Sequence, residues 1–215
     1  MLKRIVIYII GLQVVAFGSA FAIASDLGVS PMAALPYVLA LATPLSIGFL
    51  SSLKFLIFIS LQILILRKQF RIFDLIQIAF AFAFGFLLEF AIFALGNLQF
   101  PTYFGRLGML AISIFLISVG LVLILAARIV ALPPEALCVA AERRWPKFKF
   151  HLAKMALDSF LALSALTISL IALGGLFGVR EGTIISAVAI GRTIPFVKKM
   201  LNPVLSRIFK EEKNE

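Results

Sequence analysis

The chain has 215 residues, of which 62% are hydrophobic and 14% are charged, and its mean hydropathy is +1.12. A soluble domain carries about 25% charged residues, so this composition excludes a soluble globular protein and indicates an integral membrane protein. The single cysteine excludes a disulfide within the chain, and with only one histidine a zinc site built from several Cys or His side chains is excluded as well.

Six apolar runs are long enough to cross a bilayer, which takes about 20 residues. In chain order they are 4–24, 46–66, 72–96, 106–127, 152–176 and 182–198. The first run resembles a signal peptide, but it exceeds the usual apolar region of about 7–15 residues, so we expect an uncleaved first span. The prediction is an all-α, polytopic membrane helix bundle that forms a single membrane domain, 1–215.

The sequence around the first run recurs about a hundred positions later. Residues of the first copy match residues of the second at one constant offset: Arg4, Gly18, Ala24, Pro31, Ala34 and Leu35 match Arg106, Gly120, Ala126, Pro133, Ala136 and Leu137. A weaker match joins 74–85 to 181–191. An internal repeat indicates a fold built from two copies of one unit. We expect repeat one in 1–100, repeat two in 101–201, and a tail of basic and acidic residues in 202–215.

Each repeat contains a short segment that begins with proline, 31–45 in the first and 133–144 in the second. About 12 residues form about 18 Å of helix, which is too short to span. Ser30 and Pro31 fit the N-cap and first helical position, and Pro133 fits the same first position. The free N–H groups of such helix starts attract anions, so Ser30, Pro31, Pro133 and Glu135 are candidate solute-binding residues. Two arrangements stay open: helices that enter the membrane, or helices that lie at its surface.

Basic residues gather near one set of helix ends, at 3–4, 67–71, 128–149 and 198–213, whereas the other ends carry only Arg106 and Arg180. The positive-inside rule then places both termini in the cytoplasm of a cell-membrane protein. Three spans per repeat is an odd number, so the two halves are expected to be inverted. The net charge of +10 therefore reflects cytoplasmic helix ends, and we expect no nucleic-acid partner.

Four charged residues fall inside predicted spans: Glu89, Arg192, Lys54 and Asp158. A charge at the centre of a membrane helix costs about 2.5–3.5 kcal/mol on insertion scales, so these side chains should avoid lipid. Glu89 and Arg192 lie at similar depths on repeat-related helices, and we expect them to pair either as a latch or as part of a solute site. For Lys54 and Asp158 we expect a structural charge pair.

Three segments resemble the YczE/YitT-like bacterial integral membrane proteins. Residues 24–31 (ASDLGVSP) resemble the "A-D-L-G-V-S-P" element of that family, 133–137 (PPEAL) its "G-P-R-D-G-L" element, and 182–191 its last-helix "G-T" pattern. In the second element Pro134 replaces the basic residue and Glu135 stands for the acid. The resemblance covers nearly the whole chain. It implies a membrane topology and not a function, because the family has no firmly assigned activity.

Two functions are compatible with these features. Inverted repeats with paired helix breaks and intramembrane charges favour a small secondary transporter or permeation protein for a small solute, with an anion as one option. The alternative is a membrane accessory or scaffold protein that binds a partner through its basic cytoplasmic face. We expect no enzyme and no cofactor, because the sequence holds no nucleophile elbow, P-loop or dinucleotide fingerprint. The partners are the lipid bilayer and an unidentified solute, and a homo-oligomer is left open.

Overall fold

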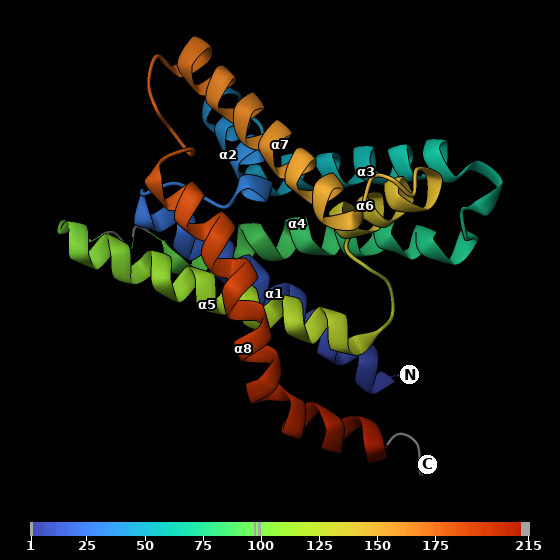
Figure 1. Cartoon of the computed structure of the whole chain (residues 1–215). Coiled ribbons are helices and arrows are strands. Elements are labelled where there is room, and N and C mark those ends of the chain that lie inside the picture. Colours follow the sequence, from blue (N-terminus) through green and yellow to red (C-terminus); the bar gives the residue numbers. More distant parts are fainter. Residues whose placement is uncertain (1, 97, 99, 212–215) are drawn as a thin grey trace.

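The computed structural model describes residues 2–96, 98 and 100–211, and within these the protein is all-α. Figure 1 shows the arrangement of the helices. The helices are α1 (Leu2–Ser25), α2 (Pro31–Ala42), α3 (Ile47–Leu66), α4 (Ile76–Leu95), α5 (Tyr103–Ala127), α6 (Pro133–Arg144), α7 (Phe150–Leu173) and α8 (Glu181–Glu211), with short 3-10 turns η1 (Arg67–Gln69) and η2 (Ile72–Leu75) between α3 and α4.

Five of these segments are long and apolar enough to cross a membrane: α1, α3 with η1, α4 with η2, α5 and α7. This confirms the prediction of a multi-pass membrane protein. The sixth predicted run, 182–198, forms the first part of α8, which is 31 residues long and contains two prolines. Arg192, Lys198 and Lys199 lower the hydropathy of α8, so it does not join the five. The helix also continues through most of the predicted tail, to Glu211.

The two proline-started segments form the short helices α2 and α6, and each is 12 residues long. Pro31 and Pro133 each occupy the first helical position, as the sequence predicts, because proline lacks the N–H that would have no partner there. Ser30 precedes α2, but its side chain makes no capping hydrogen bond. Ser30 thus holds the expected N-cap position without the expected side-chain cap, and its backbone oxygen instead accepts hydrogen bonds from the amides of Ala33 and Ala34.

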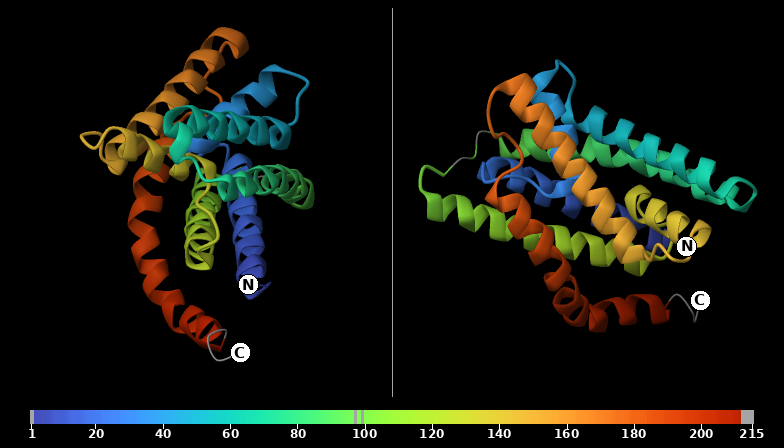
Figure 2. Two further views of the ribbon diagram at one scale, coloured as in Figure 1. Left: turned by 90° about the vertical axis from the view of Figure 1, so that its right-hand side faces the viewer. Right: turned by 45° about the horizontal axis from the view of Figure 1, so that its top comes forward.

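The centre of the bundle is the contact between α1 and α5, which cross closely at glycines (Figures 1 and 2). A Cβ built on Gly120 would lie 2.6 Å from the carbonyl oxygen of Gly11 and 2.8 Å from the amide nitrogen of Val15. The surrounding contacts come in pairs: α1 packs on α4 and α5 on α8, while α2 packs on α7 and α6 on α3.

The contact between α3 and α4 in the first half has no counterpart in the second half. Helices α3 and α4 pack closely, with Gly85 lying against Ser52 and Gly48. Helices α7 and α8 occupy the corresponding places in the second half, yet they make almost no contact with each other. Gly191 matches Gly85 in the sequence repeat, but a Cβ on Gly191 would meet nothing within 4 Å. The close packing of Gly85 in the first half therefore has no counterpart at Gly191.

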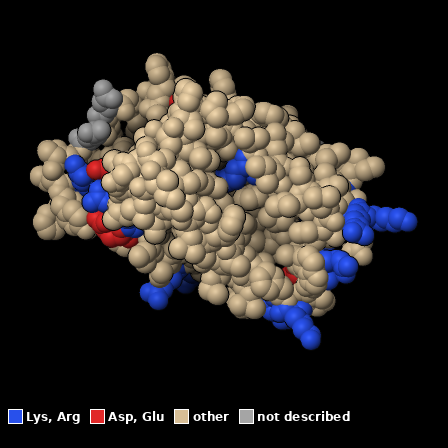
Figure 3. Space-filling model, turned by 90° about the horizontal axis from the view of Figure 1, so that it is seen from above, with Lys and Arg blue, Asp and Glu red and all other residues tan. Residues whose placement is uncertain are grey.

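The two ends of the bundle differ in charge. We call the end that holds both termini and η1 the terminal end, and the end that holds residues 26–30 and 174–180 the loop end (Figure 1). Figure 3 shows Lys and Arg projecting from the terminal end, whereas basic and acidic groups are mixed at the loop end. Arg67, Lys68 and Arg143 are among the exposed residues of the terminal end.

Candidate functional site

A central cavity of about 570 Å³ lies between the two halves of the chain, and all eight helices contribute to its lining. Most of the wall is apolar, for example Val15 on α1, Phe84 on α4 and Ile117 on α5. Hydroxyl groups come from Ser19, on α1, and Ser186, on α8. The volume falls within the range of about 300–1,000 Å³ that is usual for small-molecule pockets.

The starts of both short helices reach this cavity. Ser30 and Pro31 line it at the start of α2, and Pro134 and Glu135 line it in the first turn of α6. Pro133 is buried directly beside the lining, where its carbonyl oxygen accepts a hydrogen bond from Gln62 Nε2 at 3.1 Å. Segments about a hundred residues apart in the sequence thus present two helix N-termini to one space.

Charged side chains form a cluster on one wall of the cavity. Lys154 Nζ lies 3.1 Å from Asp158 Oδ1 and 3.7 Å from Glu135 Oε1. Lys54 also lines the cavity, and its Nζ donates a hydrogen bond to the carbonyl oxygen of Met32 at 2.6 Å. We call Lys54, Glu135, Lys154 and Asp158 the charge cluster. It holds two basic and two acidic groups.

Lys54 and Asp158, expected as a structural charge pair, line the same cavity, but no direct ion pair joins them in the part of the chain that the structure describes. Asp158 pairs with Lys154, which stands four residues earlier on α7, where side chains share one helix face. Lys54 instead satisfies the carbonyl oxygen of Met32, in the first turn of α2. The sequence analysis missed Lys154, and the Lys–Asp spacing of four residues on a helix was the signal that would have found it.

The expected pair of Glu89 and Arg192 is wrong. Glu89 Oε1 accepts a hydrogen bond from the amide of Gly48 at 2.6 Å, in the first turn of α3. That amide is one of the free donors of a helix start, and a carboxylate there also interacts favourably with the helix dipole. Arg192 is exposed on α8, and no ion pair within the described part of the chain joins the two. Neither residue lines the central cavity.

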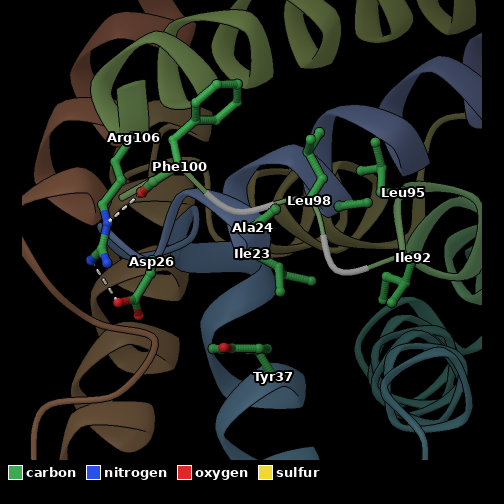
Figure 4. A pocket seen from close by; sticks show the side chains of 11 residues that line it. Ile23, Ala24, Asp26, Tyr37, Ile92, Leu95, Leu98, Phe100 and Arg106 are labelled. Carbon is green, nitrogen blue, oxygen red and sulfur yellow. Dashed lines mark hydrogen bonds and ion pairs between the residues drawn. The ribbon is translucent and has the colours of Figure 1, made fainter. Parts of the chain in front are cut away.

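A second cavity, of about 210 Å³, lies at the loop end (Figure 4). Arg106, at the start of α5, places its Nη1 3.0 Å from Asp26 Oδ2, and its Nε donates to the carbonyl oxygen of Phe100 at 3.2 Å. Arg180 Nη1 donates to the backbone oxygen of Asp26 at 2.9 Å. Asp26 has a φ of 54°, the left-handed conformation that aspartate tolerates in turns. The Asp26 carboxylate thus connects the end of α1, in repeat one, with Arg106 and Arg180 of repeat two.

Backbone hydrogen bonds close the loop end further. The amide of Gly182 donates a hydrogen bond to the carbonyl oxygen of Leu27 at 2.8 Å. The amide of Val29 donates a hydrogen bond to the carbonyl oxygen of Gly178 at 2.9 Å. A Cβ on Gly182 would lie 2.6 Å from the Leu27 oxygen, so only glycine fits this approach. The segment between α1 and α2 is therefore held against the start of α8.

A buried glutamine pair joins three helices near the terminal end. The side-chain amides of Gln62, on α3, and Gln77, on α4, exchange hydrogen bonds at 3.3 Å, and Gln62 also reaches the Pro133 oxygen on α6. Both glutamines are at most 2% exposed. Sequence reasoning missed this pair, although two glutamines in otherwise apolar runs were the available signal.

Comparison with known proteins identifies the family of this chain. Residues 2–199 match DUF6198, which is described as a family of unknown function. The chain belongs to this family. The DUF6198 match does not confirm the resemblance to YczE/YitT-like proteins, and no curated protein and no solved structure matches the chain.

Proposed function

We propose that this DUF6198 protein is a small secondary transporter or permeation protein for a small anionic solute. The observation that carries the proposal is the central cavity, in which the starts of α2 and α6 meet beside Lys54 and Lys154. Each helix start contributes the positive end of its helix dipole, about half a positive charge, although Pro31, Pro133 and Pro134 supply no N–H donor. A small anion in the cavity would gain both contributions, while the apolar remainder of the wall would accept a short hydrocarbon part.

The proposal includes a fold of two inverted repeats with α8 as the sixth span. Helix α8 has 31 residues, about 46 Å of helix, which is enough to cross with tilt. Asp26 and Arg128, at matching repeat positions after α1 and α5, both adopt a left-handed backbone, with φ of 54° and 52°. The paired helix contacts around α1 and α5 also support two equivalent halves. The positive-inside rule then puts the terminal end in the cytoplasm.

The difference between the two halves supports a moving part. Helices α3 and α4 are packed together, whereas α7 and α8 stand apart, and the cavity between them reaches Phe150 at the terminal end of α7. The loop end is closed by Asp26, Arg106 and Arg180. We infer that this conformation opens toward the cytoplasm. An exchange of the two packings, in which α7 meets α8 and α3 parts from α4, would open the cavity to the other side.

Cysteine accessibility tests the proposal without knowledge of the solute. Ser186→Cys, made with Cys138→Ser, places the chain's single thiol on the wall of the central cavity. In right-side-out and inside-out vesicles, we expect small charged methanethiosulfonate reagents to modify this thiol from both sides. Modification from one side only, or from neither, would contradict alternating access. Ile171→Cys is a matched control, since Ile171 is 82% exposed on α7 outside the cavity.

The scaffold alternative has one observation in its favour, the basic surface of the terminal end (Figure 3). A scaffold needs no central cavity, so filling the cavity separates the two functions. Ser186→Trp should abolish uptake of small carboxylates, phosphate or sulfonates into proteoliposomes. A scaffold would keep partner binding with the cavity filled. Wild-type protein that transports none of these anions, although the cavity is reached from both sides, would refute the anionic solute class.

A further inference from the structure

The charge cluster contains one carboxyl oxygen that nothing in the described structure satisfies. Glu135 Oε1 faces Lys154 at 3.7 Å, but Glu135 Oε2 is inaccessible to solvent and has no hydrogen-bond partner. We infer that Glu135 is a proton-binding site that couples solute movement to protons. The inference rests on the proposed function and specifies its coupling ion.

Titratable groups from four helices surround Glu135. Lys154 and Asp158 face it from α7 and Lys54 from α3, while Tyr8 on α1 and Cys138 on α6 lie within the range of its charge. The hydroxyl of Tyr8 is also buried without a hydrogen-bond partner. A buried carboxylate oxygen without a partner is costly, and protonation lowers that cost because it removes the negative charge.

The position of Glu135 favours a bound proton over a permanent charge. Its side chain is 26% exposed, and the residue lines the cavity. Burial raises the pKa of the Glu135 carboxyl, and Lys154 opposes that rise. Lys154 lies closer to Asp158 than to Glu135, at 3.1 Å against 3.7 Å. A movement of Lys154 toward Asp158 therefore weakens the main charge that keeps Glu135 ionised and leaves the smaller contribution of Lys54.

The charge balance links the proton to an anion. With Glu135 ionised the charge cluster is neutral, because its two lysines face two carboxylates. A hydronium ion from the open side of the cavity transfers its proton to Glu135, and a water molecule leaves. The charge cluster then carries one positive charge, and a monovalent anion restores neutrality. Proton and anion would cross together without net charge.

Only the second repeat carries this group. At the offset that matches Pro31 with Pro133, Ala33 stands in the first repeat where Glu135 stands in the second, and both line the cavity. The cavity therefore offers one carboxyl at this position and not two. We expect one coupled proton for each transport cycle.

Infrared difference spectroscopy on the purified full-length protein in liposomes tests the site with the proton itself as the probe. Between about pH 5 and about pH 9 we expect a protonated-carboxyl C=O band with a midpoint above about 4.3, the ordinary glutamate value. Glu135→Gln should abolish that band. Glu142→Gln, which removes a carboxyl from the same helix outside the cavity, should leave it unchanged. A band that survives Glu135→Gln, or wild-type protein without such a band, would overturn the inference.

A second variant keeps the test decisive if Glu135→Gln fails to fold. Glu135→Asp keeps a titratable carboxyl and should show the band at a shifted frequency, whereas an unshifted band would mean that another residue binds the proton. The two proposals fail separately. A titrating band at Glu135 in a cavity that Ser186→Cys labelling reaches from one side only would refute transport and leave the proton site standing.

Discussion

The close approach of α1 and α5 makes Gly120 a site where one methyl group should destabilise the whole bundle. A Cβ there would meet the Gly11 oxygen at 2.6 Å and the Val15 nitrogen at 2.8 Å, and both are backbone atoms that no side-chain rotation can remove. An ordinary contact begins at 3.4 Å, so the two helices must separate by about 0.8 Å. Because both atoms are backbone atoms, we expect the upper part of the usual overpacking cost, about 2–3 kcal/mol, and the gain of about 1 kcal/mol in helix propensity leaves a net loss of about 1–2 kcal/mol.

Gly191→Ala is the matched control for Gly120→Ala, because nothing lies within 4 Å of its added Cβ. The buried thiol of Cys138 serves as the reporter, since a bulky thiol-reactive fluorescent dye reacts with it far faster once the chain unfolds. For a chain of this size, 1 kcal/mol shifts the Tm by about 2–4 °C. We expect Gly120→Ala to lower the Tm by about 2–8 °C and Gly191→Ala to leave it unchanged or raise it. Equal Tm values for the two variants would refute the close packing of α1 on α5.

Three further predictions follow from single contacts. Glu89→Ala should cost about 1.5–3 kcal/mol, because it removes a charged hydrogen bond to Gly48; a double-mutant cycle with Arg192→Gln should show no coupling, and measurable coupling would restore the pair. Gln62→Ala leaves buried polar partners unsatisfied and should lower the unfolding free energy by about 1–3 kcal/mol, whereas no change in urea denaturation would contradict this latch. Burial raises the pKa of the Cys138 thiol to about 11, so its alkylation rate in folded protein should still rise tenfold per pH unit between about pH 8 and about pH 10; a plateau near pH 9 would contradict it.

The sequence by itself determined where most of the helices lie. A run of about 20 apolar residues has no other way to satisfy its backbone in lipid than as a helix, which is why five predicted spans recur as long helices. Proline at a first helical position marked both short helices, Pro31–Ala42 and Pro133–Arg144. Composition and repeat sufficed for these features because each depends on residues close together in the chain.

Only the tertiary structure decided which charges meet. Lys54, Glu135 and Asp158 reach one cavity, but each pairing depends on side-chain reach within about 4 Å. Asp158 therefore pairs with Lys154 on its own helix, and Glu89 pairs with a backbone amide. The sequence treats the two repeats alike, yet α3 meets α4 while α7 stands apart from α8. That difference arises from packing between helices, which a repeated pattern does not encode.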